Sequence, residues 1–312
     1  MVYIIILNWN GATDTINCLK SLFETEQVNH KIVICDNYSS DSSYNEIKEF
    51  LILSLPSKYR SFVEMSREDA AVLRSDNDTG VYLIKNNANL GFAGGNNVGV
   101  KFAFNQKDMD FVWLLNNDTE VLPSTLFELL KKFGDNKRFG ICGSRLVYFY
   151  ERDKIQGLGG TLNPWLCTSK HYAWLEPSNT IYNELNVESE IDYVLGASMM
   201  LSRDLIEKVG YLCEDYFLYF EEFDLCKRAR SEGFDIGVAS KSIVYHKEGA
   251  STKSGKSDVA DYFSVRNRIL ITKKFFPRYI ITVKISILGV IINRLIRKEF
   301  KRAFRYMKFI FM

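Results

Sequence analysis

The sequence predicts an α/β fold built on a mixed, mostly parallel sheet with flanking helices. The N-terminal half alternates short apolar runs with amphipathic stretches, as βαβ units do. Polar residues follow the ends of these runs, where open α/β sheets bind ligands. With 312 residues, 46% hydrophobic and 25% charged, the chain is long enough for a large core and for one or two domains.

Four apolar runs in the N-terminal half are predicted to be strands, and three amphipathic stretches are predicted to be helices. The strands span residues 2–7, 31–35, 81–85 and 111–115, and the helices span 13–24, 93–105 and 123–133. Between the second and third strands, residues 54–80 are polar and poorly patterned. They include the run Ser75-Asp76-Asn77-Asp78, and we expect an inserted excursion or a long loop there.

Fewer elements are clear in the second half of the chain. Residues 191–202 resemble a strand interrupted at Gly196, and residues 243–246 end another short strand. Residues 221–232 are expected to form a helix, because acids occupy its first turn and Arg228 and Arg230 come later, which suits the helix dipole. Gly233 is the expected C-cap of that helix.

Cysteine usage and the N-terminal residues indicate an ordinary intracellular enzyme. The six cysteines are scattered without close pairs, which argues against a disulfide framework or a zinc site and fits a reducing compartment. Residues 1–7 lack a basic leader and a small-residue cleavage site, so they predict a first strand and not a signal peptide.

Charge is distributed unevenly along the chain. Residues 263–312 contain 13 Lys and Arg against the single acid Glu299, whereas the remainder has a net charge of −10. Residues 279–296 form an apolar run broken by Lys284 and Asn293-Arg294, which is short for a membrane span. Basic and aromatic residues alternate after it, which favours a helix lying on an anionic membrane surface. The alternative is a soluble helical pair. Nucleic-acid binding is disfavoured, because the body is acidic and lacks a nucleic-acid-binding module.

Asn116-Asn117-Asp118 follows the most apolar of the predicted strands. A carboxylate among amides can hold a divalent cation through oxygen ligands, and such a cation would neutralise a diphosphate leaving group. The alternative is a turn in which Asp118 or Thr119 caps the next helix.

Two other strand ends carry polar residues, and a third carries glycines. Asn8-Trp9-Asn10 follows the first strand and Asp36 follows the second, where a carboxylate can accept a hydrogen bond from a pyrimidine ring. The segment from Asn89 to Asn97 contains Gly91, Gly94 and Gly95 and opens a helix, which suits close approach to phosphate and ribose. It lacks the spacing Gly-x-Gly-x-x-Gly, so a dehydrogenase is disfavoured.

Together these segments resemble family 2 of the inverting glycosyltransferases, and most closely its rhamnosyltransferase-like branch. The resemblance is carried in order by Asn8-Trp9-Asn10, Asp36-Asn37-x-Ser39-x-Asp41, Asn89 to Asn97, Leu114 to Asp118, Gly196-Ala197, Tyr219 to Cys226, and His246 before Gly249-Ala250-Ser251. It implies a GT-A fold, which is the Rossmann-like fold of nucleotide-diphospho-sugar transferases. The catalytic domain would span residues 1–255, followed at 256–312 by a basic helical extension that associates with membranes.

The resemblance also assigns roles by position. Donor-nucleotide contacts are expected from Asn8, Trp9, Asn10, Asp36, Asn89, Gly91, Gly94, Gly95, Asn96, Asn116 and Asn117. Asp118 and His246 would hold Mg²⁺ or Mn²⁺, with Asn116 in the place of the first acid of the family's metal motif. Gly196 and Ala197 would contact the acceptor. Glu222 is the expected catalytic base, with Glu221 and Asp224 as alternatives.

The implied function is inverting transfer of a sugar from a nucleoside diphosphate to a saccharide or lipid-linked saccharide in bacterial surface polysaccharide synthesis. The first-choice donor is dTDP-rhamnose and the second is a UDP-hexose. A non-catalytic, membrane-docked nucleotide-sugar-binding protein is the alternative from another class. No Ser-His-Asp set or cysteine nucleophile is recognisable, which is consistent with direct displacement. The expected location is cytoplasmic, peripheral on the inner face of the membrane, and association into a homo-oligomer is left open.

Overall fold

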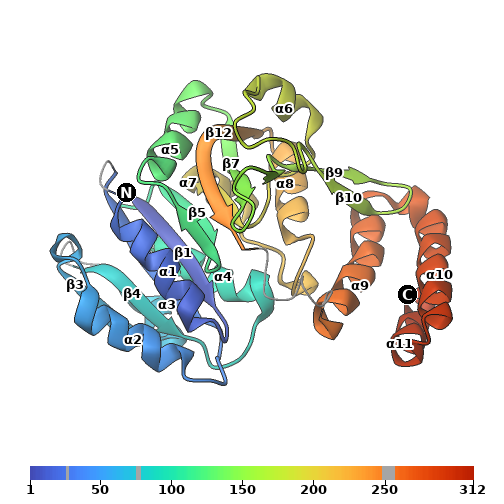
Figure 1. The fold of residues 1–312 in the computed structure, drawn as a ribbon, viewed down its shortest axis with the longest axis horizontal. Helices are drawn as coiled ribbons and strands as arrows, with labels where there is room; N and C mark the ends of the chain where they lie inside the picture. The colour runs from blue at the N-terminus through green and yellow to red at the C-terminus, as the bar shows by residue number, and fades with distance from the viewer. Residues whose placement is uncertain (26–27, 75–78, 248–256) are drawn as a thin grey trace.

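The computed structural model describes residues 1–25, 28–74, 79–247 and 257–312. Its centre is a ten-stranded mixed sheet, shown in Figure 1. The strands are β1 (Val2–Asn8), β2 (His30–Asp36), β3 (Ser61–Ser66), β4 (Thr79–Lys85), β5 (Phe111–Asn116), β6 (Thr119–Val121), β7 (Phe139–Tyr148), β8 (Ile155–Gly157), β11 (Ser198–Ser202) and β12 (Asp235–His246). A separate hairpin consists of β9 (Gly160–Asn163) and β10 (Thr168–His171).

The strand order is β3-β4-β2-β1-β5-β11-β7-β12-β6, with β8 beside β7. The first five strands in this order are parallel, whereas β11 runs antiparallel to both β5 and β7. Strand β1 lies at the centre of the parallel part, and Ile4, Ile5 and Ile6 are fully buried there. A central strand buried on both faces has to be apolar throughout, which explains the unbroken run in the sequence.

Helices flank the sheet. In chain order they are α1 (Ala12–Phe23), α2 (Ser43–Ser54), α3 (Arg67–Val72), α4 (Gly91–Phe104), α5 (Thr125–Asp135), α6 (Glu184–Glu190), α7 (Arg203–Val209) and α8 (Glu221–Ser231). Helix α4 packs on β1 and β2, and α5 packs on β7 and β12. The carboxyl ends of β5 and β12 lie at one cavity, and that of β1 lies beside β5.

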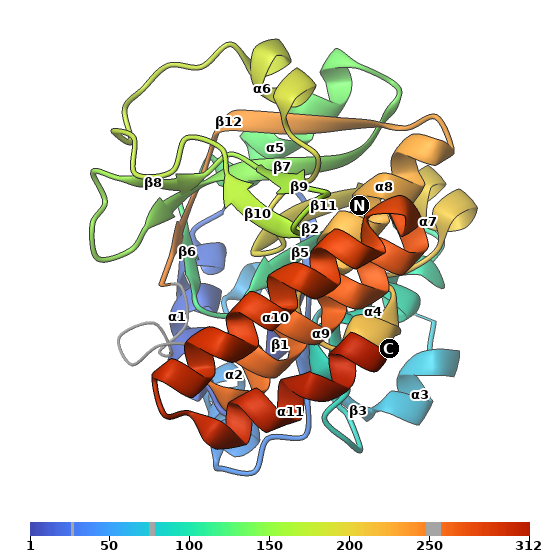
Figure 2. The same cartoon turned by 90° about the vertical axis from the view of Figure 1, so that its right-hand side faces the viewer.

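Three further helices form the C-terminal part: α9 (Asp258–Phe275), α10 (Ile280–Ile296) and α11 (Phe300–Phe311). Figure 2 shows α10 and α11 in front of α9, and all three pack on one another. They also hold the β9–β10 hairpin: Thr282 donates to the carbonyl of Trp165 at 2.7 Å, and Arg268 donates to the carbonyl of Leu166. The C-terminal helices are therefore joined to the hairpin by side-chain hydrogen bonds.

The structure confirms the predicted α/β fold, and the seven elements predicted in the N-terminal half are present within two residues at each end. The expectation of an irregular excursion at residues 54–80 was wrong. A short 3₁₀ turn (Ser57–Tyr59), β3 and α3 occupy most of that segment, and Ser66 and Asp69 form a capping box for α3. Strand β3 lies at the sheet edge and is mostly half-buried, so it lacks the apolar run of a central strand. Residues 75–78 lie outside the described chain.

The strand predicted at residues 191–202 is shorter than expected. Only Ser198–Ser202 pairs in the sheet as β11, and residues 194–197 run along the cavity. The helix predicted at 221–232 and its glycine C-cap are present, with Gly233 at a φ of +85°. Residues 248–256, which include Gly249-Ala250-Ser251 and the expected domain boundary, lie outside the described chain.

Candidate active site

A cavity of about 860 Å³ lies at the carboxyl ends of β5 and β12. Its wall includes the β5–β6 turn, the segment before β11, the start of α8 with the loop that enters it, the β9–β10 hairpin, and helices α9 and α10. Seven predicted site residues line it, namely Asn116, Asp118, Gly196, Ala197, Glu221, Glu222 and His246. Residues predicted from distant parts of the sequence therefore meet at one place.

Asp118 and His246 face each other across the cavity floor. The Oδ1 atom of Asp118 lies 3.2 Å from Nε2 of His246, and both side chains are mostly buried. The other ring nitrogen of His246, Nδ1, lies 2.8 Å from Oε1 of Gln156. Because an amide oxygen only accepts, Nδ1 donates in this pair, and Nε2 is the ring nitrogen on the side of Asp118.

Asp118 and His246 suit a divalent cation that would take most of its ligands from a bound substrate. A carboxylate oxygen and an imidazole nitrogen are both common metal ligands. The hydrogen bond to Gln156 fixes the orientation of the imidazole, as such bonds do for histidines that bind metals. No group of three or more His, Cys, Asp or Glu suited to a metal occurs in the described residues. Asp118 and His246 would supply two protein ligands to such an ion, and oxygen atoms of a substrate and of water would supply the rest.

Glu221 and Glu222 form a buried acidic pair at the start of α8. The Oε2 atom of each is buried without a hydrogen-bond partner among the described residues. Burial raises the pKa of Glu222 to about 6. Burial, and then the adjacent Glu222 carboxylate, raise the pKa of Glu221 well above its usual range. A glutamate whose pKa is raised to about 6 is still able to accept a proton near neutral pH.

The loop that leads into α8 has an unusual backbone. Phe217, Tyr219 and Phe220 have positive φ angles of 64°, 71° and 77°, a conformation that bulky residues rarely adopt. Each costs on the order of 1–3 kcal/mol and persists only where other contacts enforce it. Here Nδ2 of Asn267, on α9, donates to the carbonyls of residues 216, 218 and 219 at 2.8–3.1 Å. Asn267 therefore helps to fix the loop that carries Glu221 and Glu222.

Asp224, the third acid predicted as a possible base, lies away from the cavity. It is fully buried, and its two oxygens accept hydrogen bonds from Tyr216, Arg228 and Lys274. It is not among the residues that line the cavity. Its contacts join α8 to α9, which is a structural role.

Gly196 and Ala197 lie between the acidic pair and the metal-type ligands. A Cβ atom on Gly196 would be 3.8 Å from Cβ of Glu222, so the glycine keeps this wall open beside the acid. The backbone N–H of Asn116 donates to the carbonyl of Ala197 at 3.0 Å. This bond sets the spacing between the β5 end and the segment opposite it.

Four of the residues predicted for the nucleotide, Asn8, Trp9, Asn10 and Asp36, form a neighbouring cluster outside the cavity lining. Asn8 is buried and donates to Oδ1 of Asp36 at 2.8 Å, and Ser39 donates to both oxygens of Asp36 from its hydroxyl and its N–H. Trp9, at 55% exposure, and Asn10, with a φ of 52°, stand at the surface beside them. The cluster reaches the cavity through Asn117, whose amide donates to Thr15 at 3.1 Å.

The glycine-rich segment is used for close packing. A Cβ on Gly91 would lie 2.4 Å from the Phe217 carbonyl, one on Gly94 would lie 2.9 Å from Leu90, and one on Gly95 would lie 2.5 Å from a Leu7 methyl group. Asn89 accepts from the Gly91 N–H, and Asn96 donates within its own helix to Phe92. These residues bring α4 against β1 and against the loop before α8; of this segment only Phe92 lines the cavity.

Sequence reasoning missed three residues that shape the site: Gln156, Asn267 and Arg268. No local pattern distinguishes them, since a glutamine in a short strand and an Asn-Arg pair within a helix are ordinary. Only the packing of β8 and α9 against the site brings them there.

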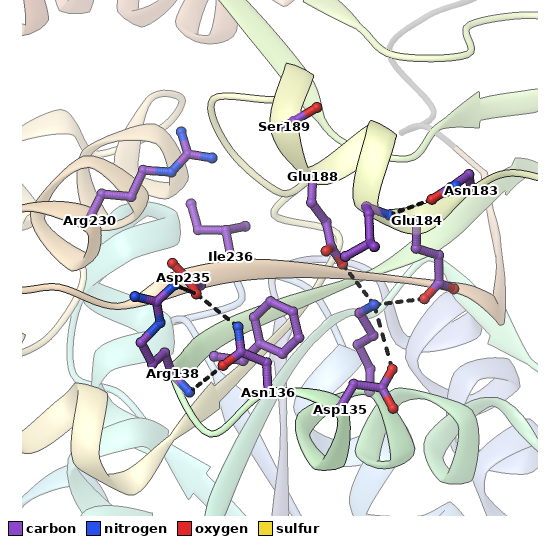
Figure 3. Close-up of a pocket in the computed structure, with 13 residues that line it drawn as sticks. Asp135, Asn136, Arg138, Asn183, Glu184, Glu188, Ser189, Arg230, Asp235 and Ile236 are labelled. Atoms are coloured by element: carbon purple, nitrogen blue, oxygen red, sulfur yellow. Dashed lines mark hydrogen bonds and ion pairs between the residues drawn. The ribbon is translucent and has the colours of Figure 1, made fainter.

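A second cavity of about 880 Å³ lies at the amino ends of β7 and β12, away from these residues (Figure 3). Its centre is Lys132, whose Nζ lies 2.8 Å from Glu184 and 2.9 Å from Glu188. Those two acids also accept from the N–H groups of Ser240 and Val238. Glu184 and Glu188 share the ammonium of Lys132 and each accepts a backbone N–H from β12, and this network secures α6 against the sheet.

The sheet and its flanking helices have a GT-A fold, and the C-terminal helices are present after it, as expected. Residues 60–210 match the family described as glycosyl transferase family 2. Residues 60–210 therefore belong to a glycosyl transferase family 2 domain.

Two curated relatives align with most of the chain. The "Low-salt glycan biosynthesis hexosyltransferase Agl10" of Haloferax volcanii is 24% identical over 88% of this chain and 86% of its own length. The "dTDP-rhamnosyl transferase RfbF" of Shigella flexneri is 22% identical over 73% of this chain and 75% of its own length.

Solved structures support the fold. The mannosyltransferase PcManGT from Pyrobaculum calidifontis, solved with GDP-Man and Mn²⁺, superposes with a TM-score of 0.57 at 11% identity, covering 100% of this chain and 83% of that one. S. aureus TarS 1–349 gives a TM-score of 0.52 at 14% identity over 86% of this chain, which spans only 64% of the TarS chain, less than two thirds.

Proposed function

We propose that this protein is a metal-dependent, inverting glycosyltransferase that moves a sugar from a nucleoside diphosphate to a saccharide or lipid-linked saccharide. The observation that carries the proposal is the cavity in which Asp118 and His246 lie near the acidic pair Glu221-Glu222. In this proposal Asp118 and His246 are the site for the donor diphosphate, and the acidic pair is the source of the base. We propose dTDP-rhamnose as the donor, in line with the name of the Shigella relative, and assembly of a surface polysaccharide as the process.

In this proposal Glu222 accepts the proton of the acceptor hydroxyl. The hydroxyl oxygen bonds to the anomeric carbon while the bond from that carbon to the diphosphate oxygen breaks on the opposite face, which inverts the configuration. Asp118 and Nε2 of His246 would hold Mg²⁺ or Mn²⁺, and the bound ion would neutralise charge on the leaving diphosphate. Gly196 and Ala197 would leave room for the acceptor beside Glu222.

The nucleoside would lie over the neighbouring cluster at the ends of β1 and β2. Asp36 is fixed there by Asn8 and Ser39, and the exposed ring of Trp9 offers a surface for stacking. The glycine segment would act through packing, by holding α4 and the loop before α8 in place.

A hexose donor, such as a UDP-hexose, is the second candidate, since the Haloferax relative is called a hexosyltransferase. A binding protein without catalysis is the third. It is disfavoured because Glu222 is held with a raised pKa in the same cavity as the metal-type ligands.

We further propose that the chain is cytoplasmic and docks peripherally on the inner face of an anionic membrane through α10 and α11. One helical segment of the described chain, Pro277–Ile296, is long and apolar enough to cross a membrane by length and composition. Its inner face argues for docking. Val283, Ile287 and Ile291 are buried, and Arg294 pairs with Asp261 at 2.9 Å; spanning would break these contacts.

The outer face suits that docking. Exposed apolar side chains line both helices, at Ile281, Ile285, Leu288, Ile292, Leu295, Ile296, Phe300, Phe304, Met307 and Phe311. Exposed basic residues accompany them, at Arg297, Lys298, Lys301, Arg305 and Lys308. We propose residues 1–255 as the catalytic domain and 256–312 as the docking segment, with α9 completing the cavity wall.

A hydrolysis screen over dTDP-rhamnose, UDP-hexoses and GDP-mannose, with Mn²⁺, Mg²⁺ or EDTA, tests the proposal and ranks the donors. We expect one donor to be hydrolysed with metal and none with EDTA. Asp118→Ala should lower turnover by roughly 10²-fold or more, because it removes the carboxylate ligand. Turnover of the folded variant within a few-fold of wild type at saturating metal would contradict the assignment.

A further inference from the structure

Helix α9 places a buried arginine in the cavity wall without a carboxylate partner. Arg268 is 7% exposed and lines the cavity that contains Glu222. No Asp or Glu of the described chain forms an ion pair with it, and its burial lowers its pKa. Taking a guanidinium out of water is costly unless an anion compensates its charge.

The hydrogen bonds of Arg268 use only one side of its guanidinium. Nε donates to the carbonyl of Leu166 at 3.1 Å, and Nη2 donates to the same carbonyl and to the Ser286 hydroxyl. These partners are neutral. Nη1, which carries two further N–H donors, makes no hydrogen bond within the described chain and is not enclosed by protein atoms. A charged donor group is thus directed at the cavity.

Arg294 lines the same cavity and shows the contrast. Its guanidinium contacts both oxygens of Asp261, at 2.9 and 3.0 Å, and Glu299 at 2.8 Å. Its charge is neutralised within the protein, and it joins α9, α10 and α11. Of these two arginines, only Arg268 has a charge left for a ligand.

We propose that Arg268 binds a phosphate group of the acceptor, so that the acceptor is a phosphate-bearing saccharide. The inference rests on the proposed function. The donor diphosphate belongs with Asp118 and His246 at the ends of β5 and β12, whereas Arg268 projects from α9, beside the β9–β10 hairpin and α10. The fork of a guanidinium matches two phosphate oxygens, and such charge-assisted bonds are among the strongest in proteins.

The phosphate has two chemical sources: the phosphate of a lipid carrier, or a polyol phosphate within a polymer. In the first case the lipid would lie toward α10, where the partner of Arg268, Ser286, adjoins the exposed Ile285. In the second case the acceptor would be water-soluble and the apolar face of α10 would play no part in binding it.

The test measures anion binding to the full chain by calorimetry in metal-free buffer with EDTA. The probes are octyl phosphate below its micelle concentration, glycerol 3-phosphate, and the neutral octyl glucoside and the carboxylate glucuronate as controls. Arg268→Gln should weaken phosphate binding by roughly 10- to 100-fold, and Arg268→Lys should restore part of it. Arg74→Gln, which removes the charge of an exposed arginine outside the cavity, should bind as wild type does.

Preference for octyl phosphate identifies a lipid phosphate and preference for glycerol 3-phosphate identifies a polyol phosphate; both outcomes support the site. Equal binding of glucuronate, or unchanged affinity in Arg268→Gln, overturns it. Phosphate binding that is lost in Asp118→Ala but kept in Arg268→Gln also overturns it, because the anion would then occupy the donor side. If Arg268→Gln does not fold, phenylglyoxal labelling of wild type decides: octyl phosphate or glycerol 3-phosphate should protect Arg268. A failed donor screen would leave these binding results intact, so the two proposals fail separately.

Discussion

At the scale of single residues, the neighbouring glutamates Glu221 and Glu222 differ in how their surroundings raise their pKa values. Glu222 has its pKa raised by burial to about 6, and Glu221 has its pKa raised further by burial and by its charged neighbour. Two carboxyl groups in one dry cavity cannot both ionise at low cost. Only Glu222 then combines ionisation at neutral pH with a place in the cavity wall.

Glu222→Gln keeps the shape of the side chain and removes the proton acceptor. We expect turnover to fall by about 10²–10⁴-fold, the usual contribution of a general base, with donor affinity nearly unchanged. Single-turnover kinetics and donor titration measure the two quantities. Glu221→Gln is the matched variant and should lose much less turnover. Equal losses in both, or a collapse of donor affinity in Glu222→Gln, would assign the base elsewhere.

The pH dependence follows from the same carboxyl group. A base works in its deprotonated form, so kcat/KM should be low below the pKa of Glu222 and should rise as pH increases through about 6. The measurement is kcat/KM from pH 5 to 8 at saturating metal. If kcat/KM instead rises near pH 4.5, the ordinary pKa of a glutamate, Glu222 is solvated in the working enzyme. Glu221→Gln should keep the limb near 6.

At the scale of elements, α9 completes a site that the sheet begins. Asn267 is fully buried, and its amide bonds to three carbonyls of the strained loop before α8. Asn267→Ala should release that strain and displace Glu222, lowering kcat by roughly 10–100-fold with little change in donor affinity. Gln106→Ala removes another buried amide, one that bonds to Phe102 and Leu73 far from the loop. If both variants lose the same activity, the effect of Asn267 is general destabilisation.

The same elements show how far the sequence could predict this molecule. Central strands such as β1 and β5 are apolar because both faces are buried, so their positions could be read from the chain. Edge strand β3 forms by backbone pairing with β4 while its side chains stay half-exposed, and no hydrophobic period marks it. For strands, sequence reading was therefore limited by how deeply each is buried.

For the site, prediction depended on the kind of contact that a residue makes. Asp118, Glu222 and His246 lie in recognisable motifs, and the structure brings them to one cavity. The functional roles assigned to them stay predictions. Asp224 lies in the same motif as Glu222 but two residues further along α8, on the other side of the helix, where it meets Arg228 and Lys274. Gln156 is placed by packing between distant segments, which a single sequence does not encode locally.

At the scale of the whole molecule, the cavity, the hairpin tip and the apolar faces of α10 and α11 lie on connected elements. Trp165, at the tip, is 56% exposed, its ring lies 4.8 Å from that of Tyr279, and its carbonyl accepts from Thr282 on α10. A membrane in contact with α10 would therefore also lie near this hairpin, whose residues Thr168 and Ser169 line the cavity. Docking would hold the acidic body close to a lipid-linked acceptor.

The membrane prediction is best tested in the full chain, because truncation before α10 would expose the faces that it buries. The triple variant Ile285→Gln, Ile292→Gln and Phe304→Gln removes apolar area from the outer face and should weaken binding to anionic liposomes by roughly tenfold or more. Ile52→Gln with Leu53→Gln is the matched control, since both residues are exposed on α2. Co-sedimentation with neutral and anionic vesicles across a salt series measures both the apolar and the electrostatic contribution to binding. Each exposed basic residue near the surface contributes about 1 kcal/mol, which salt screens. Binding that ignores lipid charge and salt, or equal losses in the control, would leave α10 and α11 as a packing or self-association element.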